Sequence, residues 1–259
     1  AQAVNTVYIY PGASLVAHPN ANLNIFSDIS HSGTLTSYNN SFINFYASIW
    51  QNNNGSRLPD ESARGIDGTG GIFTFSDLLQ NAQRINNINS VPFNGFPNLR
   101  LDNSLNVLSD IGNLHVNNNL DFRNGHLILN GFDVNVGRPG TGTITGHSHT
   151  NFIVTGPMMT GGSLVRNTTA SSPALDFPIG TAIGSYTPLK IKYTGVPQVI
   201  KFRVADNVYN KLNFPEYVNK TWIMNTANAD PSGTVELTLQ HNAADEGSRY
   251  FSSRSEAYV

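Results

Sequence analysis

The sequence contains no cysteine and few charged residues, and these absences remove several classes of chemistry. Without cysteine, the chain has no disulfide, no thiolate metal ligand and no cysteine nucleophile. Only 12% of the 259 residues are charged and the formal net charge is −2, so no strong basic field attracts nucleic acid. No run approaches the roughly 18 apolar residues of a membrane-spanning helix. We therefore expect no nucleic-acid partner and no membrane-spanning segment.

Uncharged amides and hydroxyls supply most of the polar surface. The sequence has 34 asparagines, against 17 acidic and 15 basic residues. This balance is typical of extracellular β-proteins. The chain begins Ala1-Gln2-Ala3, as a secreted protein does beside an A-x-A cleavage site. These features predict an extracellular or bacterial cell-surface location.

Apolar residues alternate with polar ones along residues 105–136, and this stretch defines the predicted fold. Alternation at period two indicates strands with one buried face. The pairs are separated by turn formers such as Asn124-Gly125 and Asn130-Gly131. Two topologies fit such short strands: a meander of hairpins, or a coil in which each strand stacks on its equivalent in the next turn. We favour the coil, because the pairs recur at nearly the side length of a parallel β-solenoid.

The predicted fold is therefore all-β, with two parts. Residues 1–170 form a short right-handed parallel β-solenoid (β-helix), in which Val4–Tyr10 caps the first rung. Residues 171–259 form an antiparallel β-sandwich, because longer segments with turn signals separate the candidate strands there. The sequence stops at Tyr258-Val259 within a strand pattern, so we expect a truncated sandwich and a longer parent protein.

Two segments interrupt the strand pattern. Residues 50–71 have no periodicity and are dense in turn formers, which predicts an inserted surface loop of the kind that carries function. Residues 76–88 form the one predicted helix, capped by Ser76 or Asp77.

The candidate chemical sites are weak. Asp60, Glu61 and Asp67 of the loop could bind calcium, but their spacing is not that of a known calcium loop, and solvated acids are the favoured interpretation. His147 and His149 could supply two metal ligands, but no third has a predictable position.

Glycan cleavage by a solenoid needs clustered carboxylates beside a basic residue. The candidates are Asp110, Asp121 and Asp133, with Arg123 and Arg138, and we expect them on a solvated outer face instead. No Gly-x-Ser-x-Gly motif or phosphate-binding loop occurs. We assign no catalytic, cofactor-binding or metal-binding residue and expect no enzyme.

The candidate interaction surface combines aromatic residues near the start of the chain with the acids of the predicted loop. Outward aromatics could form a platform for sugars, although core packing is the favoured role for such residues. The members of this surface are Tyr8, Tyr10, Trp50, Asp60, Glu61 and Asp67.

Phrases spread over nearly the whole chain resemble the N-terminal regions of very large surface proteins of Bacteroidota. They include Leu58-Pro59-Asp60-Glu61-Ser62, Gly70-Gly71-Ile72-Phe73, Asn124-Gly125-His126-Leu127-Ile128-Leu129-Asn130-Gly131, Phe177-Pro178-Ile179-Gly180, Asn219-Lys220-Thr221-Trp222 and Leu237-Thr238-Leu239-Gln240-His241. Proteins of this gliding-motility-associated or adhesin-like family are exported by the type IX secretion system. The resemblance implies a cell-surface structural module with no catalytic residues, and it implies that Asn81–Ile85 is extended.

The sequence thus predicts a non-enzymatic, extracellular, adhesin-like structural module whose partners are other surface proteins or copies of itself. Two alternatives remain open. The first is a self-assembling surface filament subunit that pairs exposed strand edges. The second is a glycan-binding or glycan-cleaving solenoid, which a groove of acids and arginines along one face would favour.

Overall fold

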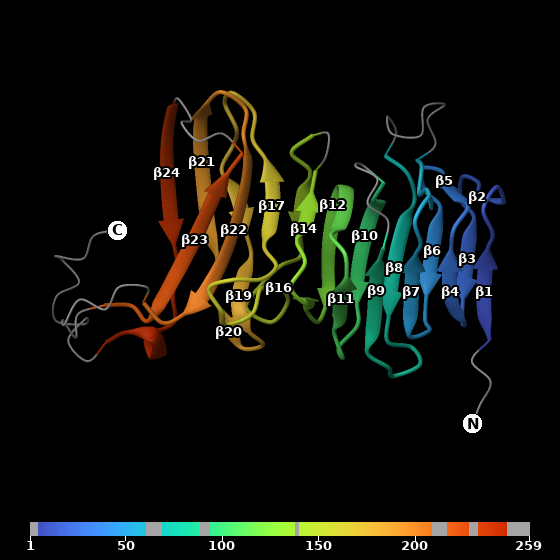
Figure 1. The fold of residues 1–259 in the computed structure, drawn as a ribbon, viewed down its shortest axis with the longest axis horizontal. Helices are drawn as coiled ribbons and strands as arrows, with labels where there is room; N and C mark the ends of the chain where they lie inside the picture. Colours follow the sequence, from blue (N-terminus) through green and yellow to red (C-terminus); the bar gives the residue numbers. More distant parts are fainter. Residues whose placement is uncertain are drawn as a thin grey trace.

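The computed structural model describes residues 5–60, 69–88, 94–137, 140–208, 217–227 and 233–247. In these residues the fold is all-β, and the one helical element is a 3-10 turn, η1 (Ala243–Asp245). No helix within the described ranges has the length and apolar character needed to cross a membrane. Figure 1 shows the strands standing side by side along the long axis of the molecule.

Two long sheets form the body of the protein. The nine-stranded sheet, called sheet I here, contains in order β1 (Thr6–Ile9), β4 (Asp28–His31), β7 (Ile49–Asn52), β9 (Gln83–Asn87), β11 (Val107–Ile111), β13 (Leu127–Leu129), β16 (Ile153–Val154), β19 (Ile179–Ala182) and β20 (Ser185–Tyr186). The ten-stranded sheet, sheet II, contains β3 (Asn22–Ile25), β6 (Phe42–Phe45), β8 (Ile72–Ser76), β10 (Phe96–Asp102), β12 (Leu114–Asn124), β14 (Val134–Val136), β17 (Leu164–Asn167), β22 (Val199–Asp206) and β23 (Lys220–Thr226), with β15 (Thr143–Thr145) beside β12.

Consecutive strands alternate between the two sheets, and each pairs in parallel with its equivalent one turn later. In sheet I, Val107 is the register partner of Leu127, a separation of 127 − 107 = 20 residues. The same sheet pairs Trp50 with Ile85, a separation of 85 − 50 = 35 residues, because an extra segment enters between them. These ladders confirm the predicted parallel β-solenoid.

The first turns have a third side. Strands β2 (Ser14–Ala17) and β5 (Thr34–Ser37) form a two-stranded parallel sheet. Arg57 extends it, because Thr34 bridges Arg57 and the Leu35 N–H donates to the Arg57 carbonyl at 2.9 Å. The stretch predicted as a loop over 50–71 therefore contains the end of β7 and a stacked bridge, and its residues 61–68 lie outside the described ranges.

The core is a column of inward side chains between the sheets. Trp50 is wholly buried and contacts the rings of Phe45, Phe73 and Phe96 at centroid distances of 5.5, 5.8 and 5.6 Å. A polar ladder lies beside these rings: Asn52 Nδ2 donates to Asn87 Oδ1 at 3.2 Å, and His31 Nδ1 lies 3.2 Å from Asn52 Oδ1. Buried amides in register thus satisfy one another along the axis.

Glycine is required where neighbouring rungs approach most closely. Gly112 has φ +73°, and a Cβ there would lie 1.9 Å from the Asn87 carbonyl oxygen. Gly125 repeats the arrangement on the next rung, against Asn103. The predicted Asn-Gly turn at 124–125 is therefore a point of contact between rungs as well as a turn.

The C-terminal strands are antiparallel and continue the solenoid. β17 pairs with β14 in parallel on one side and with β22 in antiparallel fashion on the other. A separate antiparallel sheet contains β18 (Leu175–Phe177), β21 (Leu189–Gly195) and β24 (Gly233–Leu239). The predicted boundary at residue 170 lies in this region, where β16 and β19 still stack in parallel.

Two local predictions are wrong. The stretch predicted as a helix, residues 76–88, contains β9, because its Ile85 side chain fills the core and its Gln83 amide donates to the Phe45 and Ala47 carbonyls. Residues 6–9 were expected to cap the solenoid, but β1 is itself the first rung of sheet I and pairs with β4.

Candidate ligand-binding groove

The outer face of sheet II carries two rows of register-matched side chains. Parallel pairing places equivalent residues directly above one another, so each row runs along the solenoid axis. The first row is Asn22, Phe42, Ile72, Asn98, Asn119 and Thr143, and the second is Asn24, Asn44, Thr74, Arg100, Asp121 and Thr145. Most of these are amides or hydroxyls, with two apolar side chains together in the first row.

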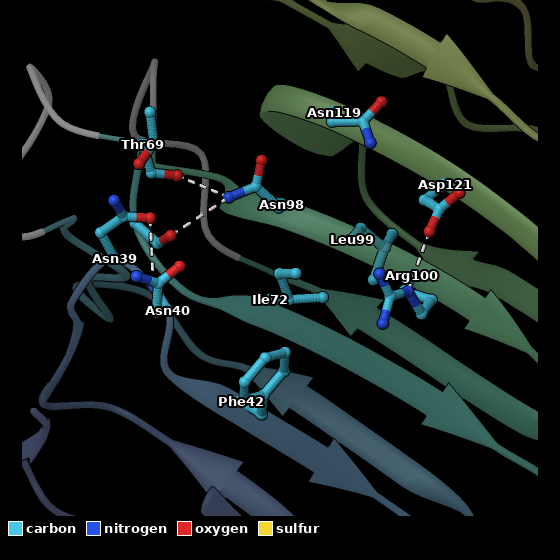
Figure 2. Close-up of a pocket in the computed structure, with 11 residues that line it drawn as sticks. Asn39, Asn40, Phe42, Thr69, Ile72, Asn98, Leu99, Arg100, Asn119 and Asp121 are labelled. Carbon is cyan, nitrogen blue, oxygen red and sulfur yellow. Dashed lines mark hydrogen bonds and ion pairs between the residues drawn. The ribbon is translucent and has the colours of Figure 1, made fainter. Parts of the chain in front are cut away.

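A groove of about 330 Å³ lies over these rows. Its described lining comes from β6, β8, β10, β12 and two loops: Asn39, Asn40, Phe42, Thr69, Gly70, Ile72, Asn98, Leu99, Arg100, Asn119 and Asp121. Figure 2 shows that Phe42 and Ile72 lie below the loop residues Asn39, Asn40 and Thr69. The groove therefore has an apolar floor beside polar walls.

Asn98 joins the loop to the sheet. Its Nδ2 donates to the carbonyl oxygens of Gly70 and Gly71 at 3.3 and 3.2 Å and also to that of Thr69. Asn118 Nδ2 donates to the Thr69 carbonyl at 3.0 Å. In Figure 2 the Asn98 amide oxygen points away from Thr69, so it faces the side where a ligand would enter.

Asp121 is the single carboxylate among the described lining residues, and arginines surround it. Arg100 Nε and Arg123 Nε donate to its Oδ2 at 2.8 and 2.9 Å, and Thr145 Oγ1 donates to its Oδ1 at 3.0 Å. Burial raises the pKa of Asp121, but the hydrogen bonds from Arg100, Thr145 and Arg123 outweigh burial and lower the pKa below its ordinary value. The side chain is therefore ionised at neutral pH.

Asp121 also corrects one expectation. Its alternation with apolar neighbours predicted a solvated carboxylate, but Asp121 is buried under its arginine partners. The other two candidate acids lie elsewhere: Asp110 accepts from Arg84 and Asn130, and Asp133 pairs with Lys201 at 2.7 Å. The three carboxylates form no shared cluster.

The predicted interaction surface is divided by the structure. Tyr8 and Tyr10 are 59% and 68% exposed, with ring centroids 6.0 Å apart at the β1 end of the molecule. Trp50 is fully buried in the core, so its assignment to a surface is wrong. Asp60 is 4% exposed, so it is not the solvated acid that was expected, and Glu61 and Asp67 lie outside the described residues.

The predicted metal candidates also separate. His147 Nδ1 lies 3.3 Å from the Tyr186 hydroxyl, whereas His149 is exposed in a turn. Burial lowers the pKa of His147 and raises the pKa of Tyr186 to about 12. No group of three or more potential metal-binding side chains occurs within the described ranges.

The groove residues were missed because their meaning depends on register. Asn98 and Asn119 are partners one rung apart, at 119 − 98 = 21 residues. That separation, which is close to one solenoid turn, is the signal that could have identified them. Comparison of the chain with protein-family models, with curated proteins and with solved structures finds no match.

Proposed function

We propose that the chain is a non-enzymatic, adhesin-like structural module of the bacterial cell surface, and that its groove on sheet II binds an extended glycan. The observation that carries the glycan proposal is the combination of an exposed Phe42 and Ile72 floor with the amides of Asn98 and Asn119. The resemblance to type IX-secreted surface proteins of Bacteroidota supports the location.

The groove chemistry fits neutral sugars. An amide side chain both donates and accepts hydrogen bonds, as a sugar hydroxyl does. An exposed aromatic ring beside such amides offers an apolar face to the carbon-bound hydrogens of a pyranose ring. Because the protein carries little net charge, recognition depends on this local match and not on long-range attraction.

Binding is favoured over cleavage. Most glycoside hydrolases need two carboxyl groups with different protonation states across the scissile bond. Asp121 is kept ionised by Arg100 and Arg123, and the described lining contributes no second carboxyl group. The groove therefore suits a binding role.

The test is binding of the purified protein to an array of polysaccharides, followed by affinity measurements on any glycan retained. We expect Phe42→Ala to weaken binding about tenfold, equivalent to about 1.4 kcal/mol. Tyr8→Ala is the matched control, because it removes an exposed aromatic ring at the β1 end. Asn119→Ala should also weaken binding, whereas Gln51→Ala on the outer face of sheet I should not.

The outcomes separate the candidate surfaces. Loss of affinity in Tyr8→Ala with none in Phe42→Ala would move the site to the N-terminal aromatic pair. Absence of binding to any glycan would overturn the groove proposal and leave the structural role alone.

A second candidate function is self-association at the β1 end. Strands β1, β2 and β3 each pair on one side only within the described residues. Val7 and Val16 are exposed there, and unpaired apolar edges favour strand addition by another chain. Sedimentation over a range of concentrations tests this proposal: Val16→Lys should shift the population toward monomer, and a wild-type protein that is monomeric throughout would contradict it.

A further inference from the structure

Lys220 lies in a buried cluster at the point where the antiparallel strands join the solenoid. It is the first residue of β23, and its register partner is Asp206, the last residue of β22. The Lys220 side chain is 6% exposed, and its Nζ contacts Asp206 Oδ1 and lies 3.2 Å from Asp245 Oδ1. The Thr181 and Ser185 hydroxyl oxygens accept from Nζ at 3.3 and 3.2 Å.

The two carboxyl groups are held by the backbone around them. The Asn219 N–H donates to the Asp245 carbonyl at 2.6 Å, and the Asn242 N–H donates to Asp245 Oδ2 at 3.2 Å, which leaves Oδ1 directed at Lys220. Asp206 is fixed by its own N–H, which donates to the Pro157 carbonyl at 2.9 Å. An amine and two acids are thus positioned before any reaction.

The other lysine pairs of the described chain differ in both exposure and composition. Lys201 contacts one carboxylate, Asp133, with the Lys201 side chain 38% exposed. Lys190 contacts one carboxylate, Asp176, and both partners are largely open to solvent. Within the described residues, Lys220 is the lysine that is buried and contacts two acids.

We propose that Lys220 and Asp206 condense to an intramolecular isopeptide bond, with Asp245 as the proton carrier. The reactants are the Lys220 ammonium, the Asp206 carboxylic acid and the Asp245 carboxylate. Asp245 takes one proton from the ammonium, and the neutral amine attacks the Asp206 carboxyl carbon. The new C–N bond forms as the Asp206 hydroxyl leaves.

The protons balance in this step. The tetrahedral intermediate loses its hydroxyl with a second amine proton, relayed by Asp245, and these leave as one water molecule. The products are the amide with one N–H, the water and Asp245 in its acid form. No oxidant or other reactant is needed.

The surroundings favour the reaction. Two carboxylates beside one ammonium disfavour ionisation of both acids, so one carries a proton. Exclusion of water from Lys220 favours neutral groups over charged ones, and holding the partners in contact replaces a collision between separate molecules. Asp206 is 38% exposed on its outer side, which gives the released water a path to solvent.

Intact mass spectrometry of the denatured full chain is the primary test. We expect the mass to be lower than the sequence mass by one water. Digestion should yield a branched peptide in which residues 206 and 220 are joined. This mapping also excludes loss of water at Asp67-Gly68, the kind of sequence that can cyclise to a succinimide.

Asp206→Asn is an informative variant, because an asparagine at this position would release ammonia and leave the same amide. Its mature mass should therefore equal that of the mature wild-type protein. Lys220→Arg, Asp206→Ala and Asp245→Ala should each keep their full sequence mass. Lys201 with Asp133 is the internal control, and their peptides should remain separate.

A wild-type protein at its full sequence mass would overturn the proposal, as would a branched peptide that joins other residues. The readout is made on the unfolded wild-type chain, so it does not depend on whether any variant folds.

Discussion

Arg100 Nε donates a hydrogen bond to Asp121 Oδ2 at 2.8 Å, and the two residues are register partners on β10 and β12. This contact connects two rungs across the outer face of sheet II. It also fixes the charge at one end of the groove, since the same oxygen accepts from Arg123.

Asp121→Asn should lower the free energy of unfolding at pH 7 by about 1 to 2 kcal/mol, because two arginines lose a charged acceptor. The folded-state pKa of Asp121 lies below its unfolded value of about 3.9. Its contribution is therefore present above that value and is lost as the pH falls through the folded pKa. Urea unfolding at pH 7 and pH 3 should show the difference between variant and wild type shrinking at the lower pH.

Arg100→Met should cost about 1 kcal/mol at pH 7, since it removes one hydrogen bond to a buried carboxylate. Arg84→Met is the matched control: Arg84 pairs with Asp110 at the same 2.8 Å distance, but its side chain is mostly exposed. We expect the control to change stability by less than about 0.5 kcal/mol. Equal losses in the two variants would contradict the role assigned to burial.

Trp50→Ala should destabilise the solenoid by about 3 to 5 kcal/mol, because it leaves a cavity among Phe45, Phe73 and Phe96. The exposed Leu78 offers a control, in which Leu78→Ala should change little. Thermal unfolding followed by circular dichroism measures both. A small effect in Trp50→Ala would show that the described core is packed differently.

Gly112→Ala and Gly131→Ala compare close approach with backbone strain. Both glycines have positive φ, +73° and +86°, but open space surrounds Gly131 while the Asn87 carbonyl lies against Gly112. Gly131→Ala should cost about 1 kcal/mol from conformation alone. Gly112→Ala should cost clearly more in the same denaturant titration, because the neighbouring rung must move.

His31→Asn should weaken the dependence of stability on pH between 7 and 5. Burial lowers the pKa of His31, against the smaller raising effect of hydrogen bonds with Asn52 and Gly33. The unfolded chain therefore binds a proton more readily below about pH 6.5, and stability falls as the pH decreases from there. An unchanged slope of unfolding free energy against pH in the variant would contradict this assignment.

Alternation was enough to predict the stacked short strands, but not the polar members of the core. His31, Asn52 and Asn87 lie inward in register, where an apolar residue is the usual choice. Because Asn52 breaks the apolar pattern of β7, the strand was interpreted as part of a loop, and Trp50 as a surface residue. A buried amide is stable there only because the next rung supplies its partner.

The groove was beyond prediction for a related reason. Along the pairing of β10 with β12, the separation of partners changes from 116 − 96 = 20 to 119 − 98 = 21 and then to 124 − 102 = 22 residues. These register shifts mean that no constant period aligns Arg100 with Asp121. Tertiary pairing, and not local pattern, decides which side chains meet on the outer face.

The rung-by-rung hydrogen bonding also determines how the protein would respond to mechanical tension. These bonds run along the long axis of Figure 1, so a pull that separates the two ends of the molecule loads the strands from the side. Such loading peels one rung at a time. A rung of 20 residues, as between Val107 and Leu127, would release roughly 70 Å of extended chain. The solenoid should therefore lengthen in discrete steps under force and dissipate energy at each one.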